Sequence, residues 1–174
     1  MGSIFFRKSD EATTVFFGII LGLIVFFFAA IFSRLNVDVH HQGIMFAAAM
    51  RVLNGEPLYI GNLYYYGPLV PILNASGILI FGKHLLVLQL MASACYGVIA
   101  ILLWRIWARF LPEWLSGITV LFSFLLAPFL YWEFLPWSSI YSLLFLLLSL
   151  YFSIKWIETK IYGLLNLVGI FAAL

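Results

Sequence analysis

Charged residues are scarce in this sequence. Only 9% of the 174 residues are Asp, Glu, Lys or Arg, whereas a soluble globular domain carries about 25%. Hydrophobic residues make up 65%, so water cannot be the main solvent of the folded chain. The formal net charge is only +2, which leaves no basic patch for nucleic acid and excludes a nucleic-acid partner. The few Lys and Arg residues are better interpreted as signals of orientation in a membrane.

Cysteine is almost absent, and so are the usual motifs of soluble enzymes. The single Cys95 rules out a disulfide within the chain, and its position inside an apolar run indicates a packing role. The sequence holds no glycine-rich phosphate loop, no cysteines at metal-binding spacing and no Ser-His-Asp arrangement. Function therefore has to be sought in the few polar residues between the apolar runs.

Long apolar runs dominate what is present. A membrane-spanning helix needs about 20 apolar residues to cross roughly 30 Å of hydrocarbon. The runs that meet or approach this length are 13–32, 85–104, 111–131, 138–154 and 161–174, the last of them incomplete. Trp and Tyr gather near the ends of the runs, as they do at headgroup level. The sequence therefore predicts an all-α integral membrane protein, a multi-span helical bundle.

The two ends of the chain indicate how it sits in a larger protein. Arg7 and Lys8 precede a first run longer than the ~7 to 15 residues of a cleavable signal core, so we expect a retained signal anchor. The last run, 161–174, is about 14 residues long and is too short to cross the bilayer. We expect residues 1–174 to form one transmembrane domain, the N-terminal portion of a longer membrane module.

The stretch 68–82 is the ambiguous apolar run. It has about 15 residues and is interrupted by polar ones, so we expect it not to cross. With the N-terminus inside, this places about six basic residues in the cytoplasm and about three outside, as the positive-inside rule favours. A five-span arrangement with the N-terminus outside gives the same split, but Arg7 and Lys8 beside the first span argue against it. The result is one long external loop, 33–84.

The external loop holds most of the unusual residues. Asp38 precedes a largely apolar stretch, 39–53, whose spacing predicts a helix lying at the interface. The residues Asn-Gly-Glu-Pro at 54–57 end this helix, because Gly takes the left-handed cap and Pro restricts the residue before it. A tyrosine-rich stretch then leads into the short helix of 68–82.

The polar residues directly after the first span are the candidates for chemistry. Asp38 could act as a general base towards an acceptor hydroxyl, or could bind a divalent metal ion that neutralises a departing phosphate. His40 and His41 could donate hydrogen bonds to that phosphate or join a metal site, and Arg51 could pair with it as a fixed charge. Simpler roles stay open, namely helix capping for Asp38, interfacial solvation for the histidines and snorkelling for Arg51.

The order of short motifs in this region resembles a known family. The motifs are Asp38, Val39, His40, His41, Gln42 and Gly43, then Ala49, then 52–59, then Tyr66, Gly67, Pro68 and Leu69, then Phe81 and Gly82. Their order and spacing resemble the first external loop of GT-C glycosyltransferases, near the protein O-mannosyltransferase and lipid A aminoarabinose transferase branches. The match covers Arg34 to about Arg109, and each motif by itself is short.

The resemblance implies a GT-C-like fold with external juxtamembrane helices and a catalytic Asp that matches Asp38. It implies inverting transfer of a sugar from a polyprenyl-phosphate-linked donor to a lipid, glycan or protein acceptor. The expected location is the plasma (inner) membrane of a bacterium or archaeon, among membrane lipids and with the catalytic loop outside. Whether a divalent metal ion takes part stays open.

A second acid and a run of tyrosines fit the family pattern less closely. In these families an acidic residue often follows a Leu-Pro pair in the second external loop, but here Glu133 precedes that pair. Glu133 is therefore either a substitute second acid or a charge at the membrane boundary. Tyr64, Tyr65 and Tyr66 could line a groove for the lipid or acceptor, or could anchor the chain at the interface.

Two other function classes stay open, a transporter or channel subunit and a non-catalytic membrane scaffold. Transport sites usually place ionisable groups near the bilayer midplane. Here the charged residues lie at the predicted ends of the spans, which favours chemistry at the membrane surface.

Overall fold

The computed structural model describes residues 11–35, 37–59, 67–131, 134 and 136–174. Every regular element in this part of the chain is an α-helix. The helices are α1 (Glu11–Leu35), α2 (Val39–Leu53), α3 (Leu69–Phe81), α4 (Leu85–Trp107), α5 (Glu113–Tyr131), α6 (Ser138–Thr159) and α7 (Gly163–Ala173). The predicted all-α class is confirmed for these residues.

Three of these helices are long and apolar enough to cross a membrane. They are α4, α6 and the stretch Val15–Leu35 of α1. The described apolar parts of the other helices in the bundle are shorter, Glu113–Ala127 in α5 and Gly163–Ala173 in α7. The protein is therefore compatible with a membrane location, while the spans expected at 111–131 and 161–174 stay predictions.

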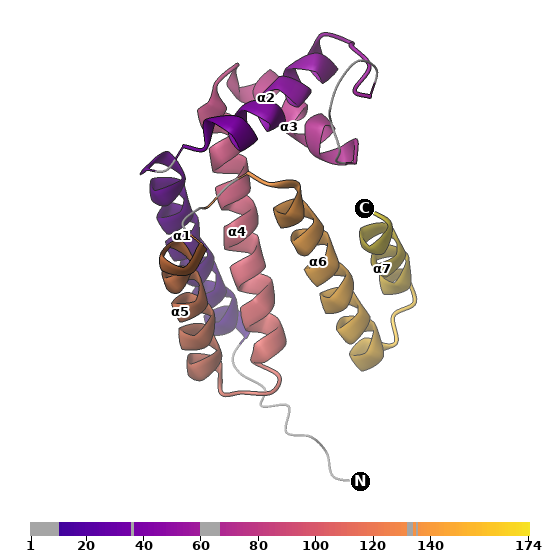
Figure 1. The fold of residues 1–174 in the computed structure, drawn as a ribbon. Coiled ribbons are helices and arrows are strands. Elements are labelled where there is room, and N and C mark those ends of the chain that lie inside the picture. The colour runs from indigo at the N-terminus through magenta and orange to yellow at the C-terminus, as the bar shows by residue number, and fades with distance from the viewer. Residues whose placement is uncertain (1–10, 36, 60–66, 132–133, 135) are drawn as a thin grey trace.

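The helices form a bundle that is covered at one end. Figure 1 shows α1, α4 and α5 close together, α6 and α7 beyond α4, and α2 with α3 across one end, which we call the cap end. α1 packs mainly on α4, α6 packs on α4 and α7, and α2 packs on α3. The helix within the stretch 68–82 is α3, which is only 13 residues long and packs on α2 and on α4 at the cap end.

α1 and α4 approach each other closely at two glycines. A Cβ atom on Gly97 would lie 2.8 Å from the carbonyl oxygen of Gly22, and one on Gly22 would lie 2.6 Å from the side chain of Ile101. Small residues at helix interfaces in membranes let backbones come close, which increases van der Waals contact. A larger side chain at Gly22 or Gly97 would therefore push the two helices apart.

A buried tryptophan ties α5 to this pair. Trp104 of α4 is 1% exposed, and its Nε1 donates a hydrogen bond to the carbonyl oxygen of Glu113 at 3.2 Å. Its ring also meets that of Phe17 on α1, with the centroids 5.2 Å apart. Gly117 of α5 leaves room for Phe17, since a Cβ there would lie 2.8 Å from that ring. α1, α4 and α5 thus form one packed unit.

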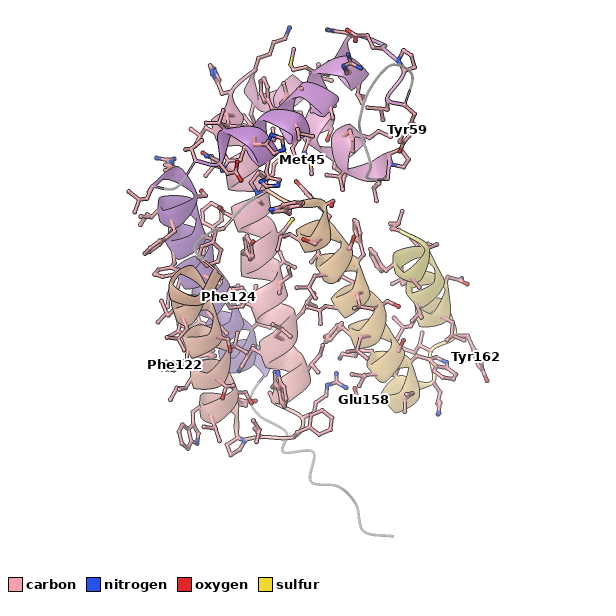
Figure 2. All side chains as sticks on the ribbon, viewed as in Figure 1. Met45, Tyr59, Phe122, Phe124, Glu158 and Tyr162 are labelled. Atoms are coloured by element: carbon pink, nitrogen blue, oxygen red, sulfur yellow. The ribbon has the colours of Figure 1, made fainter. Side chains whose placement is uncertain are left out.

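The outer surface of the bundle is apolar. Large hydrophobic side chains that are more than half exposed include Phe16 and Phe27 on α1, Ile118 and Phe122 on α5, and Leu146 on α6. Phe122 lies on the outer side of α5 in Figure 2. Soluble monomers rarely expose apolar patches larger than a few hundred Å². Lipid is the solvent that suits these side chains.

Four of the seven described basic residues lie at the opposite end of the bundle. Arg105 and Arg109 lie at the end of α4, and Lys155 and Lys160 lie at the end of α6. Arg109 forms an ion pair with Glu158, which joins the ends of these two helices. Arg34, Arg51 and Lys83 lie at the cap end, so the described Lys and Arg residues divide four to three between the two ends. The wider split of about six to three, of the kind that orients membrane proteins, comes from counting Arg7 and Lys8 beside the first span.

We predict that Gly97→Ala destabilises the bundle, because its Cβ would press on the Gly22 carbonyl and force α1 and α4 apart. Overpacking of this kind typically costs about 1–3 kcal/mol. Thermal unfolding of the detergent-solubilised protein, followed as loss of the monodisperse species, measures the effect. Gly169→Ala is the matched control, since a Cβ there meets nothing within 4 Å. Equal stability of the two variants would contradict the close contact.

We predict that Lys83 lies on the external side of the membrane, because α3 stays at the cap end and α4 begins there. In a Cys95→Ser background, Lys83→Cys should react with a membrane-impermeant maleimide added to intact cells. Thr159→Cys, exposed at the end of α6, should react only after permeabilisation. The reverse pattern of labelling would overturn the proposed orientation.

Candidate functional site

Asp38 joins the end of α1 to the start of α2. Its backbone has φ −77° and ψ 97°, and its Oδ1 accepts hydrogen bonds from the backbone N–H groups of His40 at 2.9 Å and His41 at 3.1 Å. The first N–H groups of a helix lack partners within it, and an Asp at this position supplies one. The capping role of Asp38 is confirmed, and it holds the carboxylate in place at the start of α2.

The other carboxylate oxygen of Asp38 pairs with a histidine. Oδ2 forms a hydrogen bond with Nδ1 of His41, one turn along α2. These contacts lower the pKa of Asp38, chiefly through the side-chain bond to His41 and then through the backbone bond to the same residue. The carboxylate is therefore ionised at neutral pH and can only accept, so Nδ1 of His41 supplies the proton of this bond, and in the neutral form of the ring the other nitrogen is the acceptor. Nε2, across the ring, then holds a lone pair.

An aromatic residue from just before α6 reaches this pair. The ring of Trp137 lies against that of His41, with the centroids 4.4 Å apart. Phe134, which is 2% exposed, anchors the same segment, because its ring contacts Phe28 of α1 and Tyr96 of α4. The segment between α5 and α6, where the family resemblance implies a second site residue, thus contributes Trp137 to the surroundings of His41.

Buried polar side chains connect three helices next to Asp38. Gln89 of α4 donates through Nε2 to Oε1 of Gln42 on α2 and to the carbonyl oxygen of Ser33 on α1, each at 3.0 Å. We call these three residues the polar junction, and each is at most 5% exposed. A buried polar group without a partner is costly, so the junction favours one placement of the start of α2 relative to α1 and α4.

A second buried hydrogen bond attaches α6 to the cap end. The hydroxyl of Tyr141 on α6 donates to Oδ1 of Asn74 on α3 at 2.7 Å. The hydrophobic cluster around it joins four helices and consists of Met45, Ala48, Ala49, Val70, Ala75, Ile78, Leu88 and Tyr141, of which Met45 is labelled in Figure 2. These contacts hold the start of α6, and with it Trp137, close to α2.

Of the remaining predicted site residues, His40 lies beside the pair, Arg51 lies apart from it, and the others lie outside the described residues. His40 is exposed, and its ring meets that of His41 edge-on at 5.1 Å. Arg51 follows Asp38 by 13 residues, roughly 20 Å along a helix, and its Nε lies 3.7 Å from Oε2 of Glu56. The candidates that lie outside the described residues are Glu133, Tyr64, Tyr65 and Tyr66.

Few side chains near Asp38 could serve as metal ligands. Within the residues that the structure describes, no group of three or more His, Cys, Asp or Glu side chains is placed to hold a metal ion. Asp38 and His41 are engaged with each other through Oδ2 and Nδ1. The predicted metal-binding roles of Asp38, His40 and His41 therefore rest on the sequence alone.

Sequence reasoning did not single out Gln42 as a buried residue, nor Gln89 or Trp137 as part of this region. Gln89 carried a usable signal, because a polar residue within an apolar span usually faces the interior and has a partner. Trp137 carried none, since its contact with His41 joins residues 96 positions apart in the chain. That contact depends on how the helices pack.

We predict that Gln89→Leu lowers stability by about 1–3 kcal/mol, because Gln42 and the Ser33 carbonyl would lose a buried hydrogen-bond donor. Thermal unfolding in detergent measures the loss. Ser142→Leu is the control, since the exposed Ser142 hydroxyl bonds only within α6. The double variant Gln42→Leu/Gln89→Leu should recover part of the loss, because it also removes the unpaired amide. Unchanged stability of Gln89→Leu would contradict a stabilising junction.

Comparison with known proteins identifies no relative. No family model, no curated protein and no solved structure matches this chain. Its function therefore has to be inferred from its own residues and their geometry.

Proposed function

We propose that this protein is a membrane glycosyltransferase that moves a sugar from a polyprenyl-phosphate-linked donor to a hydroxyl of a lipid, glycan or protein acceptor. The observation that carries the proposal is the Asp38–His41 pair, directly after the first apolar helix. Attack by a hydroxyl on a sugar is assisted by a group that accepts its proton, and a carboxylate paired with an imidazole can supply one. The resemblance of the surrounding motifs to GT-C glycosyltransferases supports the same reaction.

The proposed location of the site suits a lipid-linked donor. The charge asymmetry favours a multi-pass arrangement with the basic end in the cytoplasm and the cap end outside, in the plasma membrane of a bacterium or archaeon. A polyprenyl carrier keeps its chain in the hydrocarbon and its phosphate at headgroup level. In this arrangement α2 and α3 lie at the external surface, so Asp38 and His41 are level with the donor phosphate.

The positions of the charged residues favour a reaction at the membrane surface over transport through the membrane. Arg34 and Arg105 lie in the last turns of α1 and α4, and Glu113 lies in the first turn of α5. A transport site usually needs such groups near the middle of the membrane. A transporter subunit or a non-catalytic scaffold would leave Asp38 with helix capping as its only role.

The central test is Asp38→Asn in the protein within its membrane. Asn caps a helix about as well as Asp, so α2 should still form. The substitution removes the negative charge that faces His41. Transfer of labelled sugar from a polyprenyl-phosphate donor should fall on the order of 100-fold or more at matched protein levels, the usual contribution of positioned proton transfer.

The control for this test is Glu113→Gln, which removes a carboxylate in the first turn of α5, away from the cap end. It should keep sugar transfer close to that of the wild type. Near-normal transfer by Asp38→Asn would show that Asp38 only caps the helix.

A further inference from the structure

Asp38 has little capacity left to accept a proton from a substrate. Its Oδ1 accepts two backbone N–H groups, and its Oδ2 is engaged by Nδ1 of His41. The same contacts hold its pKa below the usual value. A base works best when its pKa lies near the operating pH, so this carboxylate is a poor match for the proton of a hydroxyl.

His41, unlike Asp38, has an atom in position to accept a proton from a substrate. The hydrogen bond to Asp38 places the proton on Nδ1, so Nε2 is the accepting atom of the neutral ring. The His41 side chain is 38% exposed, which leaves it open to a ligand. Among the described residues, none forms a hydrogen bond with Nε2.

Contacts on its other sides hold the His41 ring in one orientation. Trp137 lies against the ring at 4.4 Å between centroids, with the planes 39° apart. Trp137 is in turn held by the packing of Phe134 and by the Tyr141 hydroxyl bond to Asn74. Precise orientation of a base towards the proton that it takes is a requirement for proton transfer.

We infer that Nε2 of His41 accepts the proton of the acceptor hydroxyl, and that Asp38 is a positioning residue that acts through His41. This inference rests on the proposed function and assigns the roles within its site. The acceptor class is an alcohol, because the group that reacts must carry a proton and an oxygen lone pair.

The proposed step balances without an additional reactant. The hydroxyl oxygen forms a bond to the anomeric carbon of the donor sugar as its proton moves to Nε2. The bond from that carbon to the phosphate oxygen breaks, and its electron pair leaves with the polyprenyl phosphate. His41 is then an imidazolium, which the negative charge of Asp38 stabilises until the proton passes to solvent.

The first measurement is sugar transfer by His41→Ala with and without added imidazole. Ala is the best helix former, and the capping bonds of Asp38 go to backbone N–H groups, so α2 should still form. Transfer should fall on the order of 100-fold or more. Imidazole should restore part of it, and substituted imidazoles of higher pKa should restore more, because the rate of proton transfer rises with the strength of the base. His84→Ala, at the exposed His84, should match the wild type.

The second measurement is the double variant Asp38→Asn/His41→Ala. If Asp38 acts only through His41, the double variant should transfer sugar no more slowly than His41→Ala alone. His41→Gln, which also lacks the imidazole, should be as slow as His41→Ala, and it replaces His41→Ala if that variant does not fold.

The outcomes separate this inference from the proposed function. If the wild type transfers no sugar from any polyprenyl-phosphate donor, the proposed function fails and the inference fails with it. If the wild type is active and His41→Ala is nearly as active, only the inference fails. A double variant much slower than His41→Ala would also overturn it, because Asp38 would then act independently. Loss in His41→Ala, partial rescue by imidazole and no further loss in the double variant support it.

Discussion

The close approach of α1 and α4 at Gly22 and Gly97 is the contact on which the rest of the structure depends. Because neither glycine has a side chain, the backbones of the two helices come close enough for Cβ atoms to be excluded. Nearer the cap end, the same pair brings Ser33 of α1 beside Gln89 of α4. Without that separation the polar junction could not form, and α2 would lose the buried bond that places its start.

The candidate site is formed partly by local sequence and partly by the packing of the helices. Local sequence supplies the helix cap and the side-chain bond between Asp38 and His41. These two residues are three positions apart, so they come together when α2 is helical. The packing of the bundle supplies Trp137, which reaches His41 only because Phe134 and Tyr141 hold the chain around it. The proton transfer that we propose needs both the local bond and the packing, since a base must be formed and must also be oriented.

A membrane location, with which the long apolar helices are compatible, accounts for the small number of polar residues and for their positions. Apolar side chains cover the outside of the bundle, and the buried contacts between helices combine aliphatic side chains with glycines, aromatic rings and a few amides and hydroxyls. The charged side chains lie near helix ends, where water and headgroups can solvate them. Within the described residues, the buried side-chain hydrogen bonds that join different helices through Gln89 and Tyr141 lie towards the cap end.

The sequence by itself determined the helical class, the helix at 39–53, the capping by Asp38 and the turn at Gly55, which has φ +72°. Each of these depends on residues within a few positions of one another, so local hydrophobic spacing and backbone preference decide them. Only the tertiary structure decided that Gln42 is buried against Gln89 and that Trp137 lies on His41. Those facts depend on helix packing and on the direction in which α2 runs from Asp38, and no local pattern encodes either.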